Sequence, residues 1–218
     1  MPARPERKPY RKPEIKTYEG QPVGRKRKTK KYGEFFYSRD MDQEKYLLCQ
    51  KLKGKGIPVE EAVQIEKIKG EKKIHVLFKA HGIEVDSLRE EQILELLPSI
   101  ARIIGDIHVQ QMIHGHPHLG NFFFHEKKGL KIGDFAFIKQ VKVDWRDIDS
   151  ILDSFETDYE FIFFEDYKKN IFFREGKPRF GRENKNFISQ FIENMVGAYP
   201  LSKEEKDKLS SVLKELYL

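Results

Sequence analysis

The chain has 218 residues, with 41 Lys or Arg against 35 Asp or Glu and a formal net charge of +6. Its length suits one domain of ordinary size or a small two-lobed one, and 17 Phe and 9 Tyr supply apolar surface for a core. No apolar run is long enough to span a membrane, we expect no secretory leader, and the single Cys49 cannot form an internal disulfide. These features exclude a membrane-embedded or disulfide-stabilised protein and predict a cytoplasmic one.

The first 31 residues are predicted to form a basic, Pro-rich arm. They hold twelve Lys or Arg against three Glu, a net charge of +9, which leaves −3 for the rest of the chain. Without hydrophobic periodicity, the segment by itself is predicted to be disordered or extended. It is either a solubilising or localisation tail or a contact for a polyanion, because each phosphate that it neutralises releases a counterion.

We predict that the arm binds RNA or a ribonucleoprotein such as the ribosome, with no evident specificity for DNA. The residues predicted to make this contact are the basic ones at Arg4, Arg7, Lys8, Arg11, Lys12, Arg25, Lys26, Arg27, Lys28, Lys30 and Lys31.

Two further regions are predicted after the arm, and together they indicate an α+β fold. Residues 32–81 hold a predicted strand, a helix and two more strands, at residues 34–37, 42–53, 63–68 and 74–79. The helix is expected to bury Leu47, Leu48 and Leu52 on one side and to end at Gly54.

Residues 82–218 are predicted to be mainly helical, with a linker at 82–85. The predicted helices start at Pro98, which is placed in a first turn, and then cover residues 147–155, 186–196 and 203–217. Ser202 and Glu205 form a capping box before the last helix, whose expected buried stripe is Leu209, Val212, Leu213 and Leu216. Between the first two helices, residues 122–124 and 130–132 are predicted to pair as a hairpin.

The most informative stretch runs from His114 to Asp134. In phosphoryl-transfer enzymes a His-x-Asp-x4-Asn loop, a short hairpin and an Asp-Phe-Gly follow one another. The first Asp is the base, and the Asn and the last Asp hold magnesium. Here His114 and Asn121 have that spacing and Asp134 follows the predicted hairpin, but His116 stands where the base should be. The sequence therefore keeps the two oxygen ligands for magnesium and lacks the base.

This succession of helix, loop, hairpin and Asp-Phe resembles the atypical small protein kinases over residues 34–155. The most similar are the kinase subunit of the KEOPS tRNA-modification complex and, more loosely, the RIO and lipopolysaccharide kinases. The resemblance implies a protein-kinase-like two-lobed fold, with a reduced N-lobe at 32–81 and a helical C-lobe at 82–218. It also implies that Glu44 pairs with a phosphate-binding lysine and that Asn121 and Asp134 bind Mg-ATP.

The departures from that family predict a pseudokinase. No Gly-x-Gly-x-x-Gly precedes the first strands, no lysine lies in an obvious apolar strand, and Ala136 replaces the last glycine of Asp-Phe-Gly. His116 can accept a proton, but as a cation it no longer orients a hydroxyl as aspartate does. We therefore expect no cofactor, or only weakly bound Mg-ATP. The alternative is an active atypical ATP-dependent kinase, with Asn121 and Asp134 holding magnesium and His116 in the base position.

Two further alternatives stay open. His114, His116 and His118 alternate, as the ligands of a metallohydrolase can, although no downstream histidine after His125 would complete a zinc site. The stretch 172–182 interleaves aromatic with basic residues, which fits either a second RNA contact or an exposed basic loop.

Overall fold

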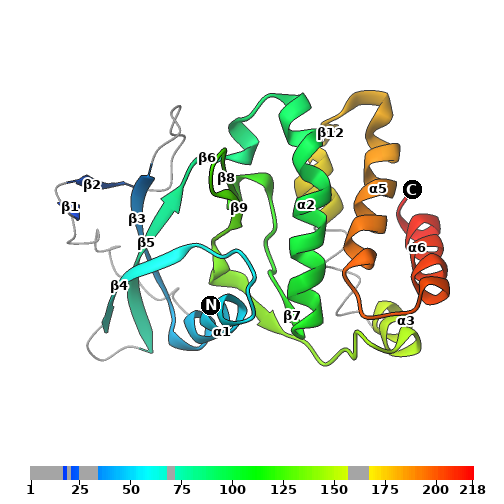
Figure 1. Cartoon of the computed structure of the whole chain (residues 1–218), viewed down its shortest axis with the longest axis horizontal. Helices are drawn as coiled ribbons and strands as arrows, with labels where there is room; N and C mark the ends of the chain where they lie inside the picture. The colour runs from blue at the N-terminus through cyan, green and yellow to red at the C-terminus, as the bar shows by residue number, and fades with distance from the viewer. Residues whose placement is uncertain (1–16, 19–20, 25–33, 68–71, 157–166) are drawn as a thin grey trace, which may run out of the picture.

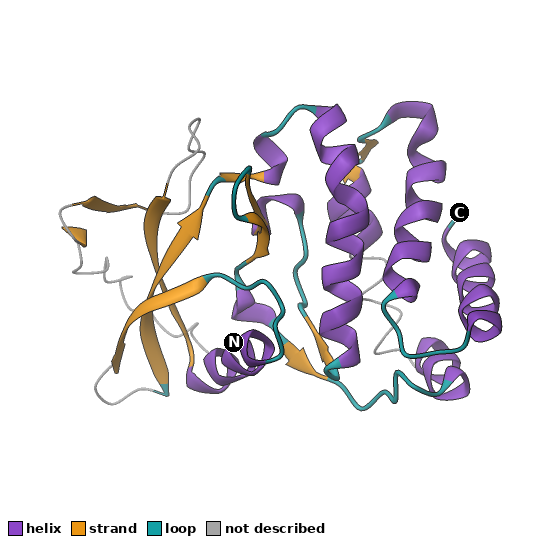
Figure 2. Ribbon diagram, in the orientation of Figure 1, coloured by secondary structure: helices purple, strands orange, loops and turns teal. Residues whose placement is uncertain are grey.

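The computed structural model describes residues 17–18, 21–24, 34–67, 72–156 and 167–218. The fold is mixed α+β, with a sheet at one end of the molecule and most of the helices at the other (Figure 1, Figure 2). The elements of the sheet end are β1 (Thr17–Tyr18), β2 (Gln21–Gly24), β3 (Glu34–Asp42), α1 (Gln43–Gly54), β4 (Glu61–Lys67) and β5 (Lys73–His81).

The sheet has five strands in the order β1-β2-β3-β5-β4. β3 and β5 pair antiparallel over their whole length, from Glu34 opposite His81 to Asp42 opposite Lys73. Tyr37 and Met41 on β3 are buried, whereas Asp40 between them is exposed. Because side chains alternate along a strand, this pattern turns the face with Tyr37, Arg39 and Met41 toward the rest of the molecule.

Part of the predicted arm belongs to the sheet. β1 pairs with β2, and β2 pairs parallel with β3, at Val23 opposite Phe36 and Gly24 opposite Tyr37. An arm that ends at residue 31 would be separate from the folded part. These few residues instead pair with it. The division into regions at 31 and 81 otherwise stays a prediction.

The helix predicted at 42–53 is confirmed as α1; of its three expected buried leucines, Leu52 is buried and Leu48 packs half-buried against the core, but Leu47 does not. Cys49 and Leu52 are buried, whereas Leu47 is 58% exposed. At about 100° per residue, Leu47 lies nearly opposite Cys49 and Leu52, so the three leucines could not share one face. Burial also raises the pKa of the Cys49 thiol to about 12, which leaves it protonated and unreactive.

The helical end contains a small sheet and the long helices. Its elements are β6 (Ile83–Glu84), η1 (Val85–Ser87), α2 (Glu90–Val109), β7 (Met112–Ile113), η2 (Leu119–Asn121), β8 (Phe122–His125), β9 (Gly129–Ile132), η3 (Phe135–Phe137), β10 (Lys139–Gln140), α3 (Ile148–Glu156), the π-helical turn η4 (Lys168–Phe172), β11 (Phe173–Arg174), β12 (Lys177–Pro178), η5 (Gly181–Glu183), α5 (Asn184–Gly197) and α6 (Lys203–Tyr217). α5 lies beside α2, and α6 lies outside α5 (Figure 1).

The predicted hairpin and the later helices are confirmed, with corrections at three points. α2 begins at Glu90, so Pro98 lies inside the helix and not in its first turn; the strong helix formers of residues 90–97 extend it. The segment expected as a linker contains β6, which pairs with β8. In α6 the capping box of Ser202 and Glu205 is present, but Leu216 is 47% exposed and Tyr217 is buried in its place.

No helix within the described ranges is both long and apolar enough to cross a membrane.

Candidate functional site

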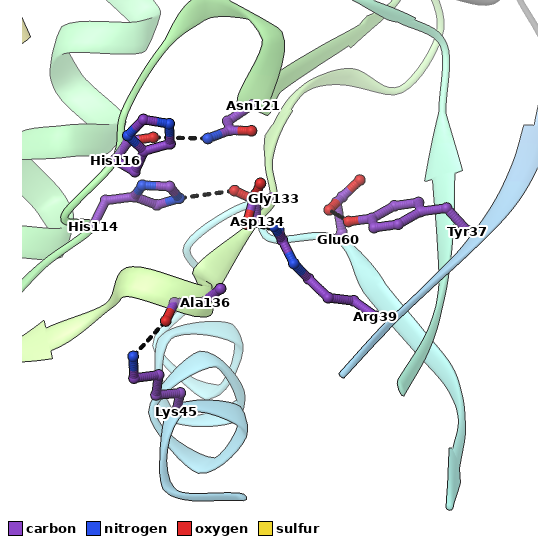
Figure 3. A network of polar contacts seen from close by, with 10 residues as sticks. All are labelled: Tyr37, Arg39, Lys45, Glu60, His114, His116, Asn121, Gly133, Asp134 and Ala136. Carbon is purple, nitrogen blue, oxygen red and sulfur yellow. Dashed lines mark hydrogen bonds and ion pairs between the residues drawn. The ribbon is translucent and has the colours of Figure 1, made fainter. Parts of the chain in front are cut away.

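The β8–β9 hairpin brings Asn121 and Asp134 toward one another, as their sequence spacing predicted. Phe122 pairs with Ile132, and the Gly133 N–H donates to the Asn121 carbonyl at 2.8 Å. Asn121 precedes the hairpin and Asp134 follows it, so both residues lie at its open end (Figure 3). The two proposed magnesium ligands are thus neighbours in the structure.

The Asn121 side chain also stabilises the loop that precedes it. It is fully buried, and its Nδ2 donates to the carbonyl oxygen of His116 at 2.7 Å. This bond closes the loop between the two residues, so the amide helps to fix the position of His116.

The histidines of the loop do not converge on one point. His114 is buried, and its Nε2 donates to the Gly133 carbonyl at 2.8 Å while its ring packs edge-on against Phe135. His116 is exposed, with its ring 4.8 Å from that of His118 and 5.4 Å from that of Phe137. In the described part of the chain, no three His, Cys, Asp or Glu side chains form a group that could hold a metal ion. The structure thus offers no support for a metallohydrolase.

Gly115 lets the loop cross closely over η3. Its φ is +75°, and a Cβ added there would lie 2.2 Å from the carbonyl oxygen of Phe137. Both the backbone conformation and the space therefore require glycine between His114 and His116.

Asp134 forms an ion pair with Arg39 of β3 (Figure 3). The Asp134 side chain is only 9% exposed, and its backbone has a left-handed conformation with φ 64° and ψ 55°. Positive φ is uncommon for a residue other than glycine and tends to occur at functional sites. The guanidinium thus neutralises the carboxylate that the sequence nominates as a metal ligand.

The sequence pattern did not single out Arg39. The family that the loop resembles has a lysine as its phosphate-binding cation, whereas Arg39 is an arginine in the strand directly before α1. A usable signal was present, because Arg39 is the only cation between Glu34 and Asp42 and alternates with the apolar Tyr37 and Met41.

A second buried carboxylate, Glu60, also lies near the hairpin and was not predicted. Glu60 is 1% exposed, its N–H donates to the Ile132 carbonyl at 3.0 Å, and the Tyr37 hydroxyl donates to its carboxylate (Figure 3). Burial raises the pKa of Tyr37, and the negative charge of Glu60 raises it further. Tyr37 therefore remains a hydrogen-bond donor to Glu60 across the physiological range.

Glu44, the predicted partner of a phosphate-binding lysine, lies in the exposed first turn of α1. It forms no ion pair with a described cation, so its role stays a prediction. The adjacent Lys45 instead donates to the carbonyl of Ala136, and its Nζ lies 5.9 Å from the centre of the Phe137 ring. Lys45 thus joins α1 to the segment that follows Asp134.

The basic residues predicted to contact RNA all lie outside the described residues. They are Arg4, Arg7, Lys8, Arg11, Lys12, Arg25, Lys26, Arg27, Lys28, Lys30 and Lys31.

Replacing Arg39 by glutamine should strengthen magnesium binding at Asp134. The substitution removes the guanidinium with which a metal ion must compete, and a hydrogen bond to a charged group contributes about 1.5–3 kcal/mol, or roughly tenfold to a hundredfold in affinity. Calorimetric titration with MgCl₂ and with ATP, with and without magnesium, measures this in the parent, Arg39→Gln and Arg39→Gln/Asp134→Ala proteins. The parent should bind weakly or not at all. Magnesium binding that is equally tight in all three proteins would place the metal elsewhere.

Comparisons with known proteins do not assign this chain to a family. Neither a protein-family model nor a curated protein matches it. Among solved structures it is similar to a chain of the yeast RNA Pol II CTD kinase CTDK-1 complex, with 12% identity and a TM-score of 0.35 over 54% of this chain and 47% of that one. The chain spans about half the length of that neighbour, and a likeness this slight carries no argument about fold, activity or partners.

Proposed function

We propose that this chain is a catalytically impaired protein of kinase-like, two-lobed fold that acts as an RNA- or ribonucleoprotein-binding module. Binding is through the basic N-terminal segment, and the ribosome is a candidate partner. The kinase-like part of the proposal is supported by the order of elements: β3, α1, β4 and β5, then α2, the His114 loop, the β8–β9 hairpin and Asp134. This is the order in the family that the loop resembles.

The ion pair between Arg39 and Asp134 carries the proposal of weak catalysis. A magnesium ion at Asp134 would have to compete with a guanidinium that is already in place, and guanidinium–carboxylate pairs are strong, charge-assisted contacts. At the base position, His116 presents an exposed imidazole in place of a carboxylate. Both the metal site and the base are thus altered, which favours weak or no binding of Mg-ATP over phosphoryl transfer.

The uneven distribution of charge supports binding to a polyanion. Residues 1–31 carry +9, whereas the remaining residues together carry −3. Solubility alone does not require such a concentration of one sign, and a basic segment of this kind attracts the phosphate backbone of nucleic acids.

Neutralising the basic segment in the full chain should weaken RNA binding steeply. The variant replaces the eleven predicted contact residues by glutamine. Deletion is unsuitable because β2, within the same segment, pairs with β3. Binding to a labelled RNA is followed by fluorescence anisotropy at several salt concentrations. With a single-stranded RNA, we expect the slope of log K against log salt to become shallower by about 0.7 for each phosphate that the variant no longer neutralises.

Two outcomes would count against the proposal. Salt-insensitive RNA binding, or full binding by the neutralised variant, would exclude the basic segment as the RNA-binding region. Ready ATP-dependent phosphorylation that Asp134→Asn abolishes would favour the alternative of an active atypical kinase, with Asn121 and Asp134 as its magnesium ligands.

A further inference from the structure

In the stretch 172–182, which interleaves aromatic and basic residues, two of the three phenylalanines lie in the core, whereas Phe173 is half-buried and lines a hollow beside the hairpin. Phe172 and Phe180 are 1% and 3% exposed. Their ring centres lie 6.1 Å apart, and Phe172 also packs edge-on against Phe191 at 5.3 Å. These rings form part of the core and are not available to stack on bases.

Three basic residues of the same stretch, Arg174, Lys177 and Arg182, are exposed. β11 and β12 form a hairpin in which Arg174 lies directly opposite Lys177, and both residues are exposed. Like charges directly opposite one another in an antiparallel pair destabilise it. No described carboxylate forms an ion pair with either residue. Arg174 and Lys177 thus lie together without an ion pair to a described carboxylate, an arrangement that does not stabilise the hairpin.

The base of the hairpin is held in place by Arg179. Its side chain is 11% exposed and forms an ion pair with Asp86 of η1 at 2.8 Å, and its N–H donates to the Phe172 carbonyl at 2.8 Å. Arg179 thus has a structural role and positions the hairpin that carries Arg174 and Lys177. A surface positioned in this way loses less conformational entropy when it binds a ligand.

Arg174 also lines a hollow on one side of the hairpin. The hollow has a volume of about 580 Å³, and among the described residues that line it Lys168, Lys169 and Arg174 are basic and Glu175 is acidic. Arg174 also lines a second hollow, of about 390 Å³. Asp86, Glu90 and Glu175 line this second hollow together with basic residues, so its charge is mixed. Among the described residues, the excess of positive charge therefore lies on the side of the hairpin toward η4.

We propose that Lys168, Lys169, Arg174 and Lys177 form a second nucleic-acid contact, here named the basic hairpin surface, which binds backbone phosphates. Four cations within one short segment suit a string of phosphates better than a single anion, because each phosphate that they neutralise releases a counterion. Phe172 and Phe180 are buried, so the surface does not read bases through them and binds RNA and DNA of equal length to a similar extent. This contact is additional to the N-terminal segment and does not depend on it.

The test compares two double variants of the full chain that remove the same charge. Arg174→Gln/Lys177→Gln alters the basic hairpin surface, and Lys203→Gln/Lys208→Gln removes two exposed lysines from α6 as the matched control. Fluorescence anisotropy with labelled polyuridylate and polythymidylate should show roughly tenfold weaker binding for the hairpin variant, with a salt slope shallower by about 1.4, and little change for the control. All four residues are exposed, so neither variant should melt below the parent; the hairpin variant should melt at the same temperature or slightly higher, because the substitutions remove the opposed charges.

The same double variants are then made in the protein whose N-terminal cations are neutralised. A further decrease of binding in the hairpin variant of that protein supports the basic hairpin surface, even if the N-terminal segment itself proves unimportant. Equal decreases in hairpin and control variants would show an effect of net charge alone and would overturn the proposal. Binding of polyglutamate, used as a competitor, would also overturn the proposal if the same two substitutions abolished it. The surface would then bind polyanions other than nucleic acid.

Discussion

Replacing Gly105 by alanine should destabilise the protein, because the backbone of α5 lies close against α2 there. A Cβ at position 105 would lie 2.4 Å from the carbonyl oxygen of Met195 and 2.8 Å from the Cβ of Ala198. The first of these is backbone, so the helices must move apart. Overpacking of this kind costs about 1–3 kcal/mol, which exceeds the roughly 0.5–1 kcal/mol that alanine contributes in a helix interior.

Gly197, the last residue of α5, supplies a matched control. A Cβ there would meet nothing within 4 Å, and its φ is not in the left-handed region. Gly197→Ala should therefore stabilise the protein by about 0.4–1 kcal/mol, through the reduced entropy of the unfolded chain. Thermal melting followed by circular dichroism measures both variants. If Gly105→Ala melted at or above the temperature of the parent, α2 and α5 would not pack as closely as described.

Acidification should destabilise the protein through His108 of α2, beginning below about pH 6.5. His108 is fully buried, with Nδ1 2.8 Å from the Tyr199 hydroxyl and Nε2 2.7 Å from that of Tyr167, and its ring stacks on Trp145. Burial lowers the pKa of His108 from 6.5 to about 3. Between these values the unfolded chain binds a proton that the folded protein excludes, so the free energy of unfolding falls by about 1.4 kcal/mol for each pH unit.

The neighbours of His108 do not offset this destabilisation. Burial raises the pKa of Tyr199, and the nearby Tyr167 raises it further, so the Tyr199 hydroxyl stays neutral in acid. In neutral His108 one ring nitrogen donates and the other accepts, and the two hydroxyls supply the complementary groups. Protonation would make both nitrogens donors inside an apolar core.

Urea unfolding at a series of pH values compares the parent with His108→Gln, which can donate and accept but does not titrate. We expect the variant to be less stable at neutral pH and its stability to depend less on pH between 4 and 6, by about 1.4 kcal/mol per unit. His125→Gln, at the end of β8, is the control and should keep the slope of the parent. Identical slopes for His108→Gln and the parent would mean that position 108 does not contribute to acid denaturation.

Elements whose signals are local could be predicted from the amino-acid sequence. The β8–β9 hairpin follows from two apolar runs around Gly129, and the start of α6 follows from Ser202 and Glu205, which cap it within one turn. The neighbouring positions of Asn121 and Asp134 follow as well, since a hairpin necessarily brings its two ends together. Local signals also have limits: the helix formers before Pro98 extend α2 to Glu90, although proline suggested a helix start.

The partners that those residues meet depend instead on how the elements pack in three dimensions. Arg39 reaches Asp134, Tyr37 reaches Glu60, and His108 meets Tyr167 and Tyr199. The members of each pair lie on different elements, so no spacing along the chain encodes them. Leu47 is exposed for a related reason, because packing against the rest of the molecule selects which side of α1 is buried. Hydrophobic periodicity reports how residues lie around one element, whereas burial and pairing depend on the elements that pack against it.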